Sequence, residues 1–90
     1  MTTRYQRHHA IRLTDLAGEG VVLHLGSRSY FTVTETGLVI LEALKQPRTF
    51  DELVAAILAE YEVERPHAEQ SVQAFLDRCV LAELVRTVDE

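Results

Sequence analysis

The chain has 90 residues, 47% of them hydrophobic, which suffices for one small domain with one core but not for two domains of ordinary size. A single cysteine excludes an internal disulfide, and no apolar run approaches the length of about twenty residues that crosses a membrane, so we expect a soluble cytoplasmic protein. The net charge is −5, but positions 1–50 carry six basic and four acidic residues, whereas positions 51–90 carry three basic and ten acidic ones. Because nucleic-acid phosphates attract clustered Lys and Arg, this acidic C-terminal half argues against nucleic-acid binding.

The first nine residues show no hydropathic period, so we expect a flexible N-terminal tail followed by a single domain over residues 10–88. The tail has no apolar h-region and is therefore not a signal peptide. His8 and His9 are adjacent, but no Cys, Asp or further His follows at ligand spacing. We therefore expect no metal site.

Two strands are predicted between Ala10 and Leu25. In the first, Ile11 and Leu13 alternate with polar residues; in the second, aliphatic residues at 21, 23 and 25 alternate with Val22 and His24. This places His24 on the polar face, as a surface residue or as a peptide contact. Glycine at position 26, followed by serine, predicts a tight turn in which Gly supplies a positive φ.

The third strand is predicted over Ser29–Val33, which completes a three-stranded antiparallel sheet. Alternation directs Phe31 and Val33 toward the core and leaves Tyr30 and Thr32 on the other face. Tyr30 is then half exposed, either shielding the sheet or forming part of a pocket. An edge strand presents unpaired N–H and C=O groups, with which an extended peptide can pair.

Three helices follow the sheet. Thr34 is an N-cap candidate for the first, whose early turn contains Gly37 either for close packing or by tolerance. Thr49 and Glu52 form a capping box that begins the second helix. Pro66 suits the first position of the third, which is predicted over residues 67–81.

The third helix carries two neighbouring rows of residues. At 100° per residue, one row should face the core: Ala68, Val72, Phe75 and Cys79. The second row mixes polar and aliphatic residues, with Asp77 just outside it: Glu69, Gln73, Leu76 and Val80. It is either a groove wall or an extension of the core face. Beyond the helix, the apolar residues from position 84 fit a short extended segment or a frayed helix end equally well.

Catalytic motifs are absent from the sequence. It contains no Gly-rich phosphate loop, no C-x-x-C pair, no H-E-x-x-H and no G-x-S-x-G. Cys79 lies in an apolar helical pattern without a placed base. The sequence thus favours an interaction module, without cofactor, over an enzyme.

The assembled residues form an ordered set: Tyr30-Phe31-x-Val33-Thr34-x-x-Gly37, Ile40-Leu41-x-x-Leu44, Thr49-x-x-Glu52-Leu53, Tyr61-x-Val63 and Phe75-Leu76. In order and spacing they resemble the PqqD family, also called the RiPP recognition element, over residues 10 to 86. The resemblance implies an α+β, winged-helix-like fold, with a three-stranded antiparallel sheet followed by three helices. A free-standing chain of this length with an aliphatic residue after Ile40 is especially similar to the separate leader-binding half of split lasso-peptide B proteins.

Three positions depart from the family pattern. Thr34 stands where Asn is common, and Leu41 where PqqD proteins commonly have Trp, which argues against the quinone-cofactor pathway. Ala82 and Glu83 replace the usual Gly, so the end of the last helix is left open.

The resemblance implies that a leader peptide adds as a fourth strand, antiparallel to the third strand, in a groove between that strand and the third helix. The expected peptide-binding residues come from both walls: Ser29, Tyr30, Phe31, Thr32, Val33, Glu69, Gln73, Leu76, Asp77 and Val80. An aromatic leader side chain would lie between Leu76, Val80 and the sheet, and Glu69 or Asp77 would pair with a basic leader residue.

The implied function is non-catalytic recognition of the leader region of a ribosomally made precursor, here of a lasso peptide. The implied partners are a transglutaminase-like cysteine protease, which removes the leader, and an asparagine-synthetase-like cyclase, which closes the ring. Two alternatives are a winged-helix DNA-binding regulator and a structural subunit that self-associates through its exposed edge.

Overall fold

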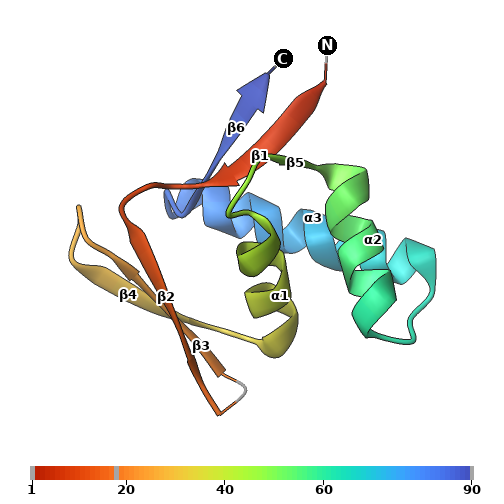
Figure 1. Cartoon of the computed structure of the whole chain (residues 1–90), viewed down its shortest axis with the longest axis horizontal. Coiled ribbons are helices and arrows are strands. Elements are labelled where there is room, and N and C mark those ends of the chain that lie inside the picture. The colour runs from red at the N-terminus through yellow and green to blue at the C-terminus, as the bar shows by residue number, and fades with distance from the viewer. Residues whose placement is uncertain (1, 18, 90) are drawn as a thin grey trace.

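A computed structural model describes residues 2–17 and 19–89. Its elements follow in the order β1 (Thr3–Arg7), β2 (Ile11–Leu16), β3 (Glu19–His24), β4 (Ser29–Val33), α1 (Glu35–Ala43), β5 (Arg48–Thr49), α2 (Phe50–Glu60), α3 (Arg65–Leu81) and β6 (Val85–Asp89). They form two small antiparallel sheets, ordered β2-β3-β4 and β5-β1-β6, beside three helices (Figure 1). The predicted α+β class is confirmed, and the second sheet is an addition to it.

The β2-β3-β4 sheet has the predicted meander, but β3 turns the opposite face inward from the one we expected. Val22 is directly opposite both Leu13 and Phe31, and directly opposite residues of an antiparallel pair share a face. Val22 is therefore buried and Leu23 exposed. His24, two residues after Val22, also points inward, with only 4% of its surface exposed. The prediction that His24 lies at the surface is wrong.

The buried imidazole of His24 organises the turn between β3 and β4. Its Nδ1 accepts hydrogen bonds from the amides of Gly26 at 3.1 Å and Ser27 at 3.3 Å, which offset part of the cost of burying a polar ring. Arg28, with φ of 59°, adopts the left-handed conformation that we had assigned to Gly26. The turn was thus predicted in the correct place but with the wrong residue in this conformation.

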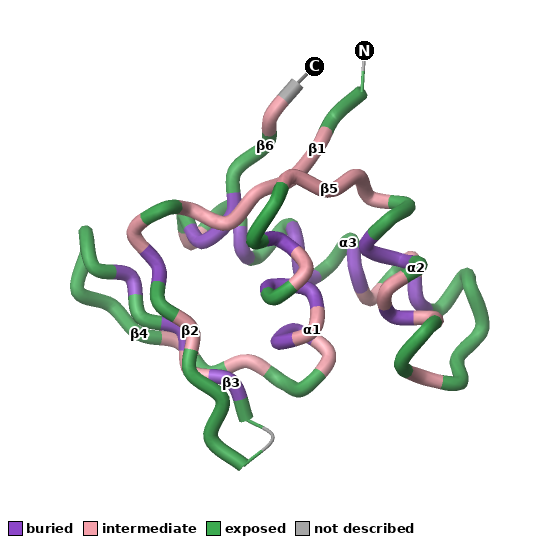
Figure 2. The backbone as a smooth tube through the Cα atoms, viewed as in Figure 1, coloured by how far each residue is buried: buried purple, intermediate pink, exposed green. Residues whose placement is uncertain are grey.

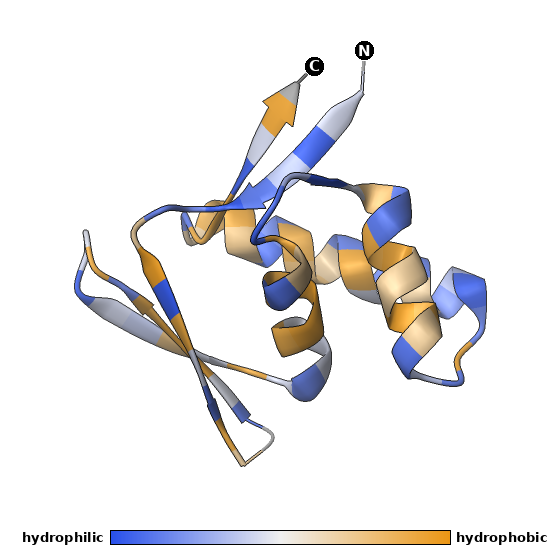
Figure 3. Cartoon of the chain, in the orientation of Figure 1, coloured by the Kyte–Doolittle hydropathy of each residue, from blue (hydrophilic) through white to orange (hydrophobic). Residues whose placement is uncertain are grey.

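The N-terminal segment is a strand rather than a flexible tail. β1 is the central strand of the second sheet and pairs with β6 from Thr3↔Asp89 to Arg7↔Val85. The amide of His8 continues the contact by donating to the carbonyl of Leu84 at 2.8 Å. Figure 3 shows β1 as largely hydrophilic, and because it has no apolar pattern, hydropathic periodicity does not predict this strand.

The helix caps agree with the sequence. Thr34 accepts from the amide of Gly37 at 3.3 Å and begins α1, while Thr49 and Glu52 form the reciprocal capping box of α2 at 3.2 and 2.9 Å. The backbone hydrogen bond from Thr49 lowers the pKa of Glu52. These caps fix where each helix starts relative to the strand before it.

The core lies where the three helices meet the inner face of the β2-β3-β4 sheet (Figure 2). Its largest fully buried side chains are aliphatic and come from β3 and all three helices: Val22, Ile40, Leu41, Leu44, Leu53, Val54, Val72 and Leu76. Within residues 2–17 and 19–89, no helix combines the length and the apolar character needed to cross a membrane.

Deleting residues 2–7 tests whether β1 contributes to folding. We expect the free energy of unfolding, measured by urea denaturation, to fall by roughly 3 kcal/mol, because each lost backbone hydrogen bond contributes about 1 kcal/mol and Tyr5 packs against the core. Deleting Thr2 alone is the control, since Thr2 precedes the strand and is exposed. Equal stability of the two deletions would show that the segment behaves as a tail.

Candidate functional site

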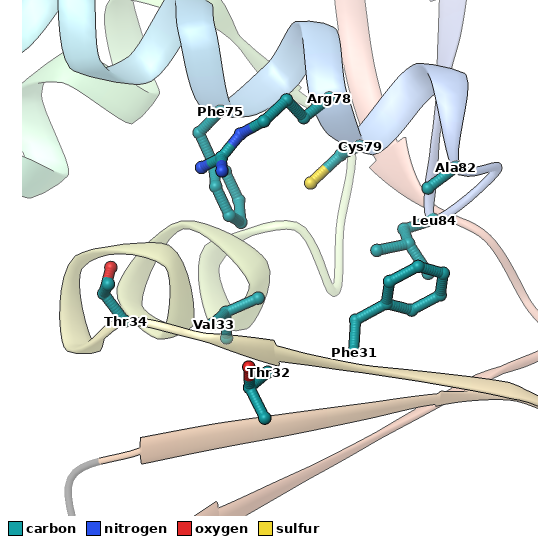
Figure 4. A pocket seen from close by; sticks show the side chains of 9 residues that line it. All are labelled: Phe31, Thr32, Val33, Thr34, Phe75, Arg78, Cys79, Ala82 and Leu84. Atoms are coloured by element: carbon teal, nitrogen blue, oxygen red, sulfur yellow. The ribbon is translucent and has the colours of Figure 1, made fainter.

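A groove of about 280 Å³ opens between β4 and the C-terminal half of α3 (Figure 4). Its lining comes from β4, the cap of α1, α3 and the turn after α3: Phe31, Thr32, Val33, Thr34, Phe75, Arg78, Cys79, Ala82 and Leu84. Most of these side chains are apolar. The groove therefore suits an apolar side chain better than a charged cofactor.

The β4 wall of the groove belongs to the edge strand of the sheet. β4 pairs with β3 and ends the order β2-β3-β4, so its other edge is unpaired within the described residues. Phe31 and Val33 are half-buried and line the groove, on the face that their alternation directs toward the core. Tyr30 is 73% exposed and does not line the groove, and neither does Ser29. These two residues therefore lie beside the groove on the strand edge.

The α3 wall is not the row that we predicted. Leu76 is 1% exposed and belongs to the core cluster, so the alternative in which it extends the core face is confirmed. Val80 is 42% exposed but does not line the groove. The wall is instead formed by Phe75, Arg78 and Cys79, together with Ala82 after the helix. Leu76 is therefore part of the core rather than the groove wall, while a peptide contact at the exposed Val80 stays a prediction.

The polar residues predicted on α3 also lie outside the groove lining. Glu69 pairs with Arg65 at 3.3 Å, and Gln73 donates to Asp77 at 2.9 Å. These are contacts between successive turns of one helix, which stabilise it slightly and leave the groove unaffected. The expected pairing of Glu69 or Asp77 with a basic ligand residue is therefore not supported by their positions.

Two residues of the α3 wall, Phe75 and Cys79, belong to the apolar row that we predicted to face the core. Ala68, Val72, Phe75 and Cys79 form the predicted apolar stripe, and all four are buried. The first two seal the core, whereas Phe75 and Cys79 also border the groove because β4 does not cover them completely. Helical periodicity identifies an apolar face but not the point along it where the covering element ends.

The turn after α3 completes the groove. The amide of Leu84 donates to the carbonyl of Cys79 at 2.8 Å and that of Glu83 to Val80 at 3.1 Å, the two hydrogen bonds of a Schellman motif. Glu83 adopts a left-handed φ of 61°, the conformation that Gly adopts most easily. The helix therefore ends in the usual way although Gly is replaced, and Leu84 is directed back onto Cys79.

The chemistry of the groove is that of a binding surface. Burial raises the pKa of the Cys79 thiol from 9.0 to about 11, so the thiol is protonated at neutral pH. The guanidinium carbon of Arg78 lies 5.9 Å from the centre of the Phe75 ring. Over residues 2–17 and 19–89, no three His, Cys, Asp or Glu side chains gather as a metal-binding group.

The fold and the groove define a small α+β protein with an open edge strand beside an apolar groove. The family model described as coenzyme PQQ synthesis protein D (PqqD) matches residues 19–85. The chain belongs to the PqqD family, and its resemblance to the RiPP recognition element is confirmed. The match starts at β3, so β1 lies outside it.

Two solved structures are similar to the chain. One is TbiB1 in complex with the TbiA(beta) leader peptide, with 32% identity, a TM-score of 0.80, and coverage of 90% of this chain and 94% of that one. The other is lasso peptide synthetase B1 complexed with the leader peptide, with 21% identity, a TM-score of 0.76, and coverage of 91% and 96%. The second likeness shows the fold alone. No curated protein matches the sequence.

Measurements of stability distinguish whether Leu76 lies in the core or in a groove wall. Leu76→Ala should lower the free energy of unfolding by roughly 2 to 5 kcal/mol, because it leaves a cavity in the core. Val80→Ala, one turn along the same helix and exposed, should change it by about 0.5 kcal/mol or less. Chemical denaturation measures both, and a similar small loss in the two variants would place Leu76 outside the core.

The raised pKa of Cys79 predicts slow thiol chemistry. At pH 8, iodoacetamide should alkylate the native protein about a hundredfold more slowly than the urea-unfolded protein, because the native thiolate fraction is smaller. The protonated thiol also stabilises the fold up to pH 9, and this contribution is lost as the pH rises from 9 to 11. Equal alkylation rates would show an accessible, ordinary thiol.

Proposed function

We propose that this chain binds the leader region of a ribosomally made precursor peptide and takes part, without catalysis, in the biosynthesis of a lasso peptide. The observation that carries the proposal is the open edge of β4 beside an apolar groove. The proposal is also supported by the similarity of the chain to TbiB1, whose structure was solved in complex with a leader peptide.

The leader would add to β4 as an antiparallel fourth strand. Backbone hydrogen bonds to the free edge of Ser29–Val33 would provide affinity for many sequences, while the groove would select among side chains. Phe31, Phe75 and Leu84 offer apolar surface to an aromatic or aliphatic leader residue. This side chain would be the anchor that fixes the register of the added strand.

Cys79 is the thiol of the groove, and its properties support a non-enzymatic role. A nucleophilic cysteine needs a lowered pKa and a neighbouring base, whereas burial raises the pKa of Cys79. Its side chain contributes apolar surface instead.

Delivery of the precursor is the finer part of the proposal. Holding the leader near a transglutaminase-like cysteine protease raises the effective concentration of the cleavage site, and an asparagine-synthetase-like cyclase would then act on the released core peptide. The cytoplasmic location expected from the sequence stays a prediction.

The DNA-binding alternative receives no support from α3. A recognition helix needs free basic side chains, but Arg65 is paired with both Asp51 at 3.7 Å and Glu69 at 3.3 Å. Arg78 lies beside Phe75 at the groove and has no ion pair among the described residues, but a single free arginine on an otherwise acidic helix is not a basic recognition surface.

The proposal is tested with the leader of a precursor encoded beside this chain and with the TbiA(beta) leader peptide. In NMR titrations we expect the amide shifts to concentrate in Ser29–Thr34 and Phe75–Leu84. Ala82→Arg, which fills the groove, should weaken binding by about tenfold or more, because it removes the space for the anchor.

The matched control is Ala55→Arg, which adds the same side chain at an exposed position of α2 away from the groove lining. It should leave the affinity unchanged. The proposal is wrong if the cognate leader produces no shifts, or if both arginine variants bind it as well as the original chain does.

A further inference from the structure

Arg78 introduces a positive charge into a groove whose lining is otherwise uncharged. Three other arginines of the described residues, Arg4, Arg48 and Arg65, lie within 4.0 Å of a carboxylate. Arg78 has no such contact among the described side chains. Its guanidinium donors are therefore available to a ligand.

The guanidinium of the exposed Arg78 side chain lies beside the Phe75 ring at the groove. Its carbon lies 5.9 Å from the centre of the Phe75 ring, and Figure 4 shows the side chain lying along that ring. A cation–π contact of this kind does not use the N–H donors of the guanidinium. The contact favours rotamers that keep the guanidinium at the groove and so lowers part of the entropy cost of binding a planar acceptor.

Its place along the groove defines which part of a bound peptide it meets. Phe31 lies near Ala82 and Leu84 at one end, and Phe75 with Arg78 lies toward the Thr34 end (Figure 4). A peptide antiparallel to β4 runs from the Thr34 end to the Phe31 end. Arg78 would therefore meet a residue N-terminal to an apolar anchor that packs at the Phe31 and Leu84 end.

Alternation in the added strand restricts this residue further. Side chains that face α3 recur at every second position, so the residue at Arg78 and the anchor are an even number of positions apart. The intervening side chains face away from α3. Near the same end, Glu19 and Glu35 line an adjoining hollow that shares Thr32, Val33 and Thr34 with the groove, and these carboxylates disfavour an acid in that hollow.

We infer that Arg78 forms a carboxylate subsite in the groove, which selects leader peptides with Asp or Glu an even number of residues before their apolar anchor. The inference rests on the proposed function. It reverses the charge that the sequence suggested, because Arg78 and not Glu69 or Asp77 lines the groove. Arg presents a bidentate fork that matches the geometry of a carboxylate.

The test begins with an mRNA-display library of random peptides selected on the original chain, on Arg78→Gln and on Arg78→Glu. The original chain should enrich Asp or Glu at alternate positions upstream of an apolar residue. Arg78→Gln should lose this preference, and Arg78→Glu should replace it with Lys or Arg. A parallel selection on Ala82→Arg identifies the peptides that depend on the groove, because their enrichment should be lost in this variant.

A single enriched peptide then gives the affinities. Changing its acidic residue to Gln should weaken binding to the original chain by about fivefold at low salt, an effect of the size seen for partly exposed ion pairs, and by less at high salt. The same change should have no effect on Arg78→Gln. Arg65→Gln, on the same helix but outside the groove, should retain the full preference.

Failure of the proposed function and failure of the carboxylate subsite give different results. Enrichment that is the same with Ala82→Arg as with the original chain contradicts the proposed function itself. Groove-dependent peptides without an acidic preference, or with one that Arg78→Gln retains, overturn the carboxylate subsite and leave leader binding intact. Circular dichroism of each variant, including Ala82→Arg at its half-buried position, checks that the fold stays in place.

Discussion

The packing of Val33 between two glycines is the constraint on which the groove depends. A Cβ atom at Gly20 would lie 2.6 Å from Cγ2 of Val33, and one at Gly37 would lie 3.2 Å from Cβ of Val33 and 2.7 Å from Cε1 of Phe75. Only glycine leaves enough room at these places for β3, β4, α1 and α3 to come together. This packing holds the last residue of β4 against the helices and so sets the distance between the two groove walls.

The groove is a continuation of the hydrophobic core. Ala68 and Val72 on α3 are covered by other elements, while Phe75 and Cys79 on the same stripe reach the point where coverage ends. The Schellman turn then directs Leu84 back to the same place. An added strand would extend both the sheet and the core at once, which is why one small domain can build the site without a dedicated loop.

The sequence predicts what local chemistry determines and misses what distant partners determine. The caps at Thr34 and Thr49 depend on neighbours within three residues, and both were correct. β1 is polar in composition and is held by pairing with β6 at the other end of the chain, so no local pattern indicates it. The face of β3 was misassigned because alternate apolar residues occur on both faces, and only Val22 opposite Phe31 settles which is inward. On α3 the apolar face was found, but its division into core and groove depends on where β4 ends.

Some side chains belong to both the core and the groove, and this limits which substitutions the protein tolerates. Replacing Phe75 to suit another peptide anchor would disturb its contact with α1 at Gly37, so changes there require compensating changes elsewhere. Arg78 is exposed and Ala82 half-buried, and both border the groove without being part of the buried core. Under the proposed function, we expect substitutions that change peptide recognition to accumulate at Arg78 and Ala82, while the glycines and Phe75 vary little.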